Sequence, residues 1–424
     1  MKIHQLEVKN FRGFERETFR FSDRFNLLIG DNGSGKTAVL DALAIAAGTF
    51  SERFVGLRHN IYDDKSRIRD TDIRQVNLKN GQNLSREYQY PVEVSCQAVI
   101  NDREISWTKS VVYNVRSITH EISIALQQIQ AKVQAGEHIT LPLIVYYGTG
   151  RLWQKKKRNE IELPNSIPRT FVYEDCLDPR SNLILDWFKV VDIPFLQEQN
   201  AFVLLNVVEE ALSICDVEGW QSFTYNKRED NLIATAKDSR TFPFDMLSDG
   251  IRNMLGMVAD IAFRAAVLNP HLGSEAARKT PGIVLIDEID LHLHPKWQRR
   301  VVEDLKRTFP EIQFFATTHS PFMIQSLRLG ELINLDRRPG EYYNKSIEDI
   351  AEDVMGVELP QHSERWQDMM KAAEEYYRVL QASQEASPEE VERLKVKLDE
   401  LSMPYSDDPA YHAFLKMERT AAGL

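Results

Sequence analysis

The chain has 424 residues, of which 43% are hydrophobic and 27% are charged, and its 52 basic and 63 acidic side chains give a net charge of −11. These values indicate a globular protein of two or three compact units and exclude a disordered chain. The negative charge argues against nucleic-acid binding over the whole surface, but it leaves room for a local basic patch.

Apolar runs and cysteines restrict the class of protein further. No apolar run approaches the roughly 20 residues that span a bilayer, and the 3 cysteines have no CxxC spacing. Neither a disulfide framework nor a zinc site is expected. We therefore predict a cytoplasmic protein that does not bind a membrane.

The N-terminal 50 residues contain the strongest motif. The opening "IHQLEVKNF" alternates like a strand and lacks the layout of a signal peptide. An apolar run, Phe25–Ile29, then predicts a buried parallel strand, and Gly30–Thr37 is a complete GxxxxGK[ST] match followed by apolar residues at helical spacing. Strand, glycine-rich loop and helix are the context that this motif requires, so we predict a phosphate-binding loop for ATP.

Each side chain of this loop has an expected role. Lys36 reaches the β- and γ-phosphate oxygens, so it is a candidate catalytic residue, and Thr37 offers its hydroxyl to Mg²⁺. The backbone amides and the following helix N-terminus surround the β-phosphate. The predicted nucleotide-binding residues of the loop are Asn32, Gly33, Ser34, Gly35, Lys36, Thr37 and Ala38.

The middle of the chain carries weaker signals. Residues 88–113 alternate and turn at "NDRE", which predicts an antiparallel meander. Leu141–Trp153 reads as a buried strand with a glycine-rich exit, a candidate Q-loop that has no glutamine at the strand end. The basic run at 155–158 is either a contact for nucleic-acid phosphate or, the favoured interpretation, a solvated loop, and residues 180–240 predict one or two helices and a hairpin.

A second glycine-containing helix entry lies in "FDMLSDGIRNML", and two apolar strands follow it. The strand Ile283–Ile286 ends in Asp287 and Glu288, where α/β folds place ligands. Asp287 is expected to hold Mg²⁺ through water, and Glu288 to polarise the attacking water as a general base. "IQFFATTHS" ends in His319, which is expected to contact the γ-phosphate.

Residues near these strands and in the tail leave alternatives open. His292 and His294 form an HxH for which backbone and subunit contacts are favoured over a metal site. The tail predicts three helices with apolar stripes, the second starting with a capping box at Ser387. These helices form either a folded helical subdomain or a module that binds another subunit.

Taken in order, these motifs resemble the ABC-type ATPases. The Walker A, signature, Walker B and switch-histidine elements correspond, in that order, to Gly30–Thr37, Leu247–Gly250, Ile283–Glu288 and His319. The opening "LEVKNFRGFERETFRF" is similar to the N-terminus of the RecF, SMC-like and OLD branch. The resemblance implies an α/β P-loop NTPase fold, that of an ABC-ATPase head with a mixed sheet core, an antiparallel β lobe and a helical lobe, plus a C-terminal helical subdomain. It also places Arg12 near the phosphates.

The resemblance further implies a homodimer or a higher homo-oligomer. In ABC-type ATPases the signature of one subunit covers the ATP held by another, so Ser248, Asp249 and Gly250 are expected to contact nucleotide in trans. Asp249 stands where many transporter subunits have glycine, which disfavours a transporter motor. The expected segments are an N-terminal ATPase lobe (1–165), an insert (166–240), the C-terminal ATPase part (241–345) and the helical subdomain (346–424).

Within this class, the chain looks like the PtuA-type ATPase subunits of Septu anti-phage defence systems, including those attached to retrons. The segments that carry this resemblance are "YYGTGR", "DEIDLHLHP", "THSPF" and the tail from "DVMGV". This resemblance implies a separate HNH nuclease partner, PtuB-like, controlled by the ATP state, with nucleic acid bound directly or through that partner. The tail has no strands that end in Glu or DxD, so no Toprim nuclease is expected in this chain. The alternative is a RecF-like repair or recombination ATPase that binds DNA directly.

Overall fold

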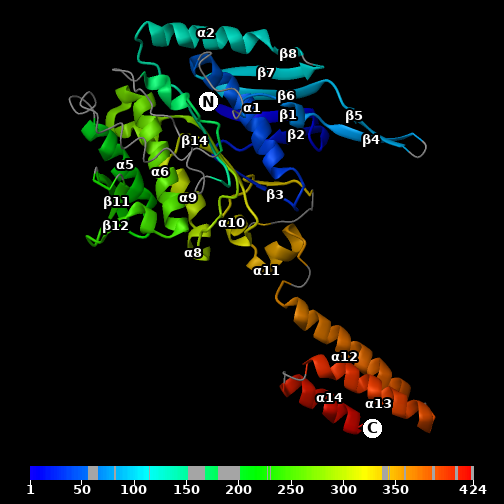
Figure 1. Ribbon diagram of the computed structural model, residues 1–424. Helices are drawn as coiled ribbons and strands as arrows, with labels where there is room; N and C mark the ends of the chain where they lie inside the picture. Colours follow the sequence, from blue (N-terminus) through cyan, green and yellow to red (C-terminus); the bar gives the residue numbers. More distant parts are fainter. Residues whose placement is uncertain are drawn as a thin grey trace. The chain divides into compact units, whose positions relative to one another are not determined.

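Five short apolar segments form a parallel sheet in the computed structural model (Figure 1). Each neighbouring pair is parallel, so the carboxyl ends of the strands meet at one edge of the sheet. The three strands predicted from apolar runs near residues 25, 283 and 312 are confirmed. In sheet order the strands are β15 (Leu332–Asn334), β3 (Phe25–Ile29), β14 (Ile312–Thr317), β13 (Gly282–Ile286) and β9 (Leu143–Tyr147).

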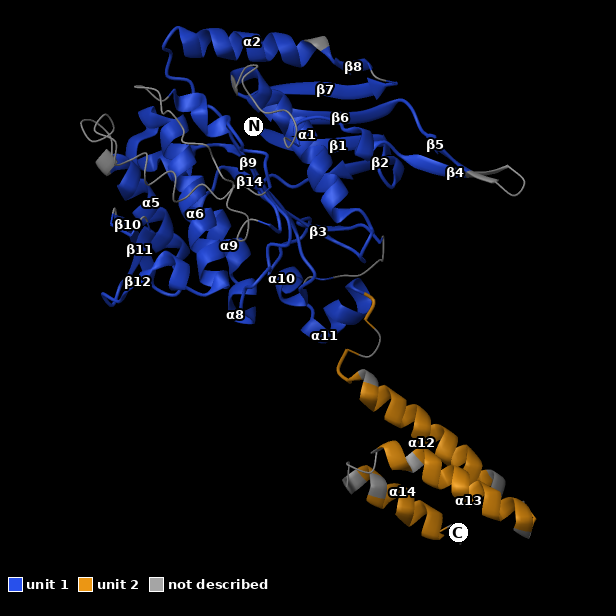
Figure 2. Cartoon of the chain, in the orientation of Figure 1, with its two compact units in different colours: residues 1–355 blue, residues 356–424 orange. Residues whose placement is uncertain are grey.

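The structure describes most of the chain, in two compact units that are coloured separately in Figure 2. The described residues are 1–55, 65–80, 83–113, 115–150, 168–179, 201–226, 228–229, 231–336, 342, 344–357, 360–383, 387–405 and 409–421.

A second, antiparallel sheet contains the N-terminal strands and the predicted meander. Its order is β2 (Phe14–Arg20), β1 (Lys2–Phe11), β6 (Val92–Ile100), β7 (Arg103–Val112) and β8 (Val115–Ile118). β6 and β7 turn at Asn101 and Asp102, as predicted, and their alternating burial shows one face packed on the core. The β4 (Gln75–Asn80) and β5 (Asn83–Tyr88) strands form a separate ribbon.

Helix α1 (Lys36–Val55) packs against both sheets, because it contacts strands of each (Figure 1). Helix α2 (His120–Gln134) packs on β7. The helical lobe consists of α5 (Ala201–Cys215), α6 (Asp249–Leu268) and α9 (Val301–Thr308), with α5 in contact with the other two. The expected ABC-ATPase head fold is therefore confirmed, with its parallel and antiparallel strands in separate sheets.

The remaining elements of the first unit are short. The predicted hairpin near residue 225 is confirmed as β10 (Trp220–Asn226) and β11 (Asn231–Ala236), to which β12 (Thr241–Pro243) adds a third strand. The short α-helices are α7 (Ala276–Lys279), α8 (Pro295–Gln298), α10 (Pro321–Gln325) and α11 (Ile347–Asp349). Single 3₁₀ or π turns span Asp70–Asp72, Arg169–Tyr173, Phe244–Met246, Pro270–Glu275, Ile350–Val354 and Met403–Tyr405.

The second unit, residues 356–424, contains the three predicted tail helices, α12 (Glu364–Ser383), α13 (Pro388–Ser402) and α14 (Pro409–Ala421). The capping box at Ser387 is also present. A small apolar cluster of its own holds the unit together, with Tyr376, Val379, Leu380, Leu398 and Leu415 buried. No helix in the described part of the chain is long and apolar enough to cross a membrane.

The unit boundary falls ten residues later than the expected start of the helical subdomain at 346. Ile350 and Val354 are buried in the core of the first unit, and the segment that carries them contacts α10. This apolar burial keeps residues 346–355 with the ATPase part.

Candidate nucleotide-binding site

The glycine-rich loop joins β3 to α1 at the carboxyl edge of the parallel sheet. Gly35 has a φ of 103°, and a Cβ added there would lie 2.5 Å from the Phe14 ring. Only glycine adopts this backbone conformation without strain, and only glycine leaves space for Phe14. The aromatic ring of Phe14 thus packs directly against the loop at Gly35.

Polar atoms of the loop fit a phosphate group. Lys36 Nζ donates to Gly30 O at 2.7 Å and to Asp31 O at 3.1 Å, so the ammonium group lies over the loop. Ser34 Oγ is buried and has no hydrogen-bond partner among the described residues. An unused hydroxyl beside a held cation at a helix N-terminus is suited to an anion.

Asp336 is a neighbour of the loop that sequence reasoning missed. Its carboxylate accepts a 2.7 Å hydrogen bond from Asp31 N. The pKa of Lys36 is lowered, because burial lowers it by more than the carboxylates of Asp336 and, after it, Asp287 raise it. The available signal was the acid that follows the apolar "LINL" segment, which repeats the strand-then-polar-tip pattern of β13.

The hydroxyl of Thr37 meets Asp287 at the end of β13. Thr37 Oγ1 lies 3.2 Å from one carboxylate oxygen of Asp287 and 3.4 Å from the other. A hydroxyl and a carboxylate in contact are ligands that suit Mg²⁺ beside nucleotide phosphates. The sequence prediction paired these two residues, which are 250 positions apart, and the structure brings them together.

Thr317 at the end of β14 is a second residue that the sequence prediction missed. Its hydroxyl donates to Asp287 Oδ1 at 2.7 Å and accepts from Glu288 N at 2.7 Å. Its carbonyl accepts from Ile289 N at 3.0 Å. One buried side chain therefore orients the Asp287 carboxylate and holds the backbone of Glu288, whose φ is 49°.

Glu288 and His319 lie at neighbouring strand ends, because β13 and β14 pair in parallel. Glu288 is half-buried and follows the buried Asp287, while His319 is exposed two residues after β14. The strand-end pattern thus brings the two predicted catalytic side chains to the same edge as the phosphate-binding loop.

Arg12 contacts carboxylates of the first unit. Its guanidinium donates to Asp72 Oδ1 at 2.8 Å and also to Asp41, one helical turn after Thr37 on α1. Burial lowers the pKa of Arg12, but the two carboxylates outweigh burial and raise it. Asp41 in turn accepts from Lys65 and from Tyr146. Arg12 is therefore held beside the start of α1.

The signature segment begins helix α6. Ser248 is the exposed N-cap residue, and Asp249 forms an ion pair with Arg252. A Cβ on Gly250 would lie 2.3 Å from His292 O, so this glycine lets the helix start pack closely on the segment after Glu288. Asn253 reinforces this contact by donating to Leu291 O at 3.3 Å. Gly250 therefore has a packing role within its own chain.

The HxH pair lies on this same segment. His294 caps α8, and its Nδ1 accepts from Lys296 N at 3.2 Å. His292 has a φ of 62°. The structure thus shows a backbone contact for the side chain of His294.

Strand β9 links the two helices of the site. Tyr146 OH donates to Asp41 on α1 at 3.0 Å, and Tyr147 OH donates to Asp260 on α6 at 2.6 Å. Successive strand residues point to opposite faces, so one strand end contacts both helices. The candidate Q-loop leaves this strand, but its Arg151 and the basic run at 155–158 lie outside the described residues.

A family model and several known proteins are similar to this chain in sequence. The family model described as "AAA domain, putative AbiEii toxin, Type IV TA system" matches residues 25–324. A "Retron Vc95 probable ATPase" of Vibrio cholerae serotype O1 biovar El Tor is 25% identical over 77% of this chain and 72% of its own length. A "Septu protein PtuA" of Bacillus mycoides (strain KBAB4) is 25% identical over 80% of this chain, which covers 41% of that relative.

Among solved structures, the SMC head bound to the C-winged helix domain of ScpA matches with a TM-score of 0.45 and 17% identity, over 79% of this chain and 94% of that one. The family match covers well over half of the chain and includes the loop, the signature segment and both strand ends. The chain therefore belongs to the family described as "AAA domain, putative AbiEii toxin, Type IV TA system", and it is an ABC-type ATPase of the RecF, SMC and OLD branch.

Proposed function

We propose that the chain is an ATP-gated dimeric switch in which two copies close on shared ATP. The amides of Asn32–Ala38 bind the β- and γ-phosphates, and Lys36 leaves the loop carbonyls to neutralise the phosphate oxygens. Thr37 and Asp287 hold Mg²⁺, which when bound offsets the charge on the phosphoryl group. The observation that carries this assignment is the 3.2 Å contact between Thr37 and Asp287 beside the loop.

Hydrolysis is assigned to the residues at the next strand ends. Glu288 accepts a hydrogen bond from the attacking water and polarises it, and His319 donates to the γ-phosphate and responds to its loss. Glu288 follows a buried carboxylate whose position is fixed by Thr317, so its backbone is held where it can face the phosphate. Arg12 supports the start of α1 through Asp41 and lies near the phosphates from that side.

The second half of the site comes from another copy. Ser248 is exposed at the N-terminus of a 20-residue helix, whose amides and dipole suit an anion. Gly250 packs this helix start against the segment after Glu288 of the same chain, so the two segments face the other copy together. Asp249 is partly neutralised by Arg252, which reduces its repulsion of phosphate.

Two variants test the dimer proposal. Glu288→Gln removes the carboxylate that polarises water, so it is expected to trap an ATP-dependent dimer, measured by light scattering with size-exclusion chromatography. Adding Ser248→Arg to this variant introduces a bulky cation at the interface and is expected to leave a monomer at the same ATP concentration. An unchanged dimer in the double variant would show that Ser248 does not lie at the interface.

In the cell, we propose that this switch is the ATPase subunit of an anti-phage defence system and controls a separate HNH nuclease. The retron and Septu names of the relatives support this role. The chain covers 41% of the length of the PtuA relative. A partner of that longer protein is therefore only a proposal for this chain. The test is the neighbouring reading frame: an HNH nuclease there that co-purifies with this ATPase in an ATP-dependent way supports the role, and a permease there refutes it.

A further inference from the structure

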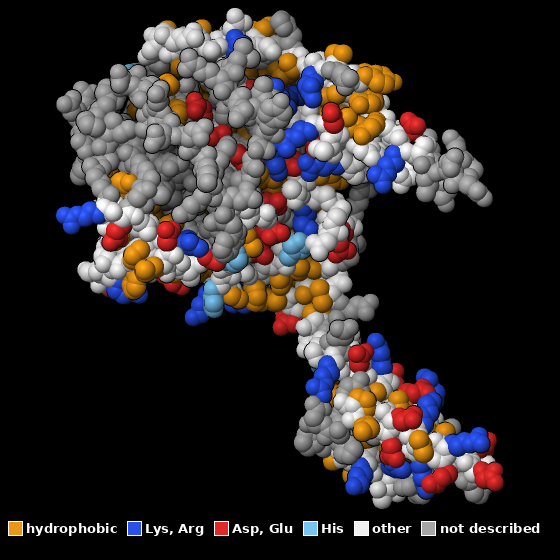
Figure 3. Space-filling view, viewed as in Figure 1, with side chains coloured by type: hydrophobic (Ala, Val, Ile, Leu, Met, Phe, Trp, Pro, Cys, Tyr) orange, Lys and Arg blue, Asp and Glu red, His pale blue; other side chains and the backbone are white. Residues whose placement is uncertain are grey.

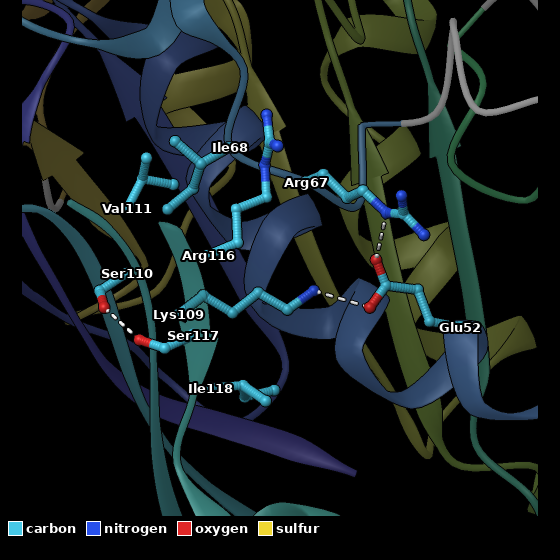
Figure 4. Close-up of a pocket in the computed structure, with 9 residues that line it drawn as sticks. All are labelled: Glu52, Arg67, Ile68, Lys109, Ser110, Val111, Arg116, Ser117 and Ile118. Atoms are coloured by element: carbon cyan, nitrogen blue, oxygen red, sulfur yellow. Dashed lines mark hydrogen bonds and ion pairs between the residues drawn. The ribbon is translucent and has the colours of Figure 1, made fainter. Parts of the chain in front are cut away.

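A pocket of about 260 Å³ lies away from the phosphate-binding loop, between β7, β8, the end of α1 and the segment that precedes Asp70 (Figure 4). Three basic side chains line it, Arg67, Lys109 and Arg116, together with one acid, Glu52. The pocket is smaller than the sites of drug-sized ligands, so it suits one small group of a larger molecule.

The charges of this pocket are unbalanced. Lys109 Nζ lies 3.0 Å from Glu52 and donates to Ser66 O at 2.8 Å, and Arg67 lies 3.5 Å from the same carboxylate. The single carboxylate of Glu52 therefore forms ion pairs with both Lys109 and Arg67. Arg116 has no ion pair with any of the described residues, so the described side chains that line the pocket carry three positive charges and one negative charge, a sum of +2.

The register of β7 and β8 places the side chains of Arg116 and Lys109 on the same face of the sheet. Arg116 is opposite Val111, and Val111 is two residues from Lys109, so all three side chains share a face of the sheet. Figure 4 shows Lys109 extending toward Glu52 while Arg116 passes Ile68. Ser110 and Ser117 also line the pocket, but their hydroxyls bond each other at 2.7 Å, so we do not count them among the groups that bind the ligand.

The surroundings allow a large ligand to approach. β8 is the edge strand of its sheet and is exposed along its length. Apolar side chains gather at the tips of β7 and β8, with Lys and Arg side chains nearby (Figure 3). The exposed apolar residues there are Val112, Tyr113, Val115 and Ile118. A ligand with both an anionic group and an apolar or aromatic part would complement this surface.

The pocket is separate from the nucleotide site. Lys36 begins α1 and Glu52 lies sixteen residues further along it, which corresponds to about 24 Å at the helical rise per residue. An anion in the pocket therefore does not occupy the phosphate-binding loop, and the two sites can be disabled independently.

We propose that this pocket binds a phosphate dianion, carried either by a small phosphomonoester or by the terminal phosphate of a polynucleotide. The net charge of +2 matches a dianion, and the guanidinium groups of Arg67 and Arg116 offer planar pairs of donors that match phosphate oxygens. Lys109 is already held by Ser66 and Glu52, so it provides a fixed positive charge behind them.

The test is calorimetric titration of the full chain with inorganic phosphate at low salt, in a Lys36→Ala background that disables the loop. Arg116→Gln is expected to weaken phosphate binding about tenfold, the value of one charge-assisted hydrogen bond. Arg67→Gln is a second variant with the same expected effect. The matched control is Arg103→Gln, which makes the same charge change at the exposed start of β7, outside the pocket, and leaves the affinity unchanged.

The two sources are separated by titrating adenosine monophosphate and a single-stranded oligonucleotide with a 5′-terminal phosphate in the same background. Equal affinities that both depend on Arg116 indicate a phosphomonoester site, whereas much tighter oligonucleotide binding with a steep salt dependence indicates a polynucleotide. If phosphate does not bind, or if Arg103→Gln weakens it as much as Arg116→Gln, the pocket is not a phosphate site. Circular dichroism of each variant verifies that it is folded.

Discussion

Thr317→Val isolates the hydroxyl that organises the metal-binding carboxylate. Valine has nearly the shape of threonine, so the change removes two 2.7 Å hydrogen bonds, to Asp287 Oδ1 and from Glu288 N, and little packing. Losing a bond to a charged group and leaving one backbone amide unsatisfied should lower the free energy of unfolding by about 2–4 kcal/mol. Losing a partner that orients a metal ligand typically costs about 10–100-fold in metal affinity or activity.

The assay is ATP turnover as a function of Mg²⁺ concentration, combined with nucleotide affinity measured with Mg²⁺ and with EDTA. The variant should need more Mg²⁺ for half-maximal turnover and bind MgATP more weakly, with unchanged affinity for ATP in EDTA. Thr317→Ser keeps the hydroxyl and should behave like the parent protein. Thr318→Val is the matched control, because the Thr318 hydroxyl accepts from Ser320 N. An unchanged Mg²⁺ requirement in Thr317→Val would refute the positioning role.

Three further changes test other parts of the account. Glu288→Gln should lower turnover by about 10²–10⁴-fold in a phosphate-release assay, because a general base is lost; turnover within a few-fold of the parent contradicts that role. Gly250→Ala should destabilise the fold by about 1–3 kcal/mol in urea unfolding, since its Cβ would meet His292 O; Gly256→Ala, whose nearest contact would be 3.8 Å away, is the control and should be neutral or stabilising. Leu398→Ala should cost about 2–5 kcal/mol within residues 356–424 and make that unit sensitive to protease, with the first unit intact; equal protection of both units would contradict separate cores.

The loop and strands of the site were predictable because their signals are local. Phe25–Ile29 and Ile283–Ile286 are continuous apolar runs, the pattern of strands buried on both faces, and the polar residues that end them must then meet at one edge. The tail helices were predictable because a capping box and apolar spacing mark them.

Other features depend on tertiary contacts that leave no local signal. Thr317 ends an apolar strand and looks like an ordinary strand residue, and only the pairing of β13 with β14 reveals its contact with Asp287. The partners of Arg12 likewise come from a distant helix and turn. The sequence shows the basic run at 155–158 as one local segment, interpreted as a solvated loop or a nucleic-acid phosphate contact, whereas the basic pocket is assembled from four separate segments.

The most direct test of the shared-site dimer is complementation between two inactive variants. Lys36→Ala destroys the phosphate-binding loop but keeps the signature, and Ser248→Arg destroys the signature but keeps the loop. In a two-fold symmetric dimer that shares its sites, a mixed dimer contains one intact site. Equal mixing should therefore raise ATP turnover well above that of either variant alone, to at most about half of the parent turnover, because each mixed dimer has one working site of two. Turnover that stays at the level of the separate variants after subunit exchange would contradict the central claim.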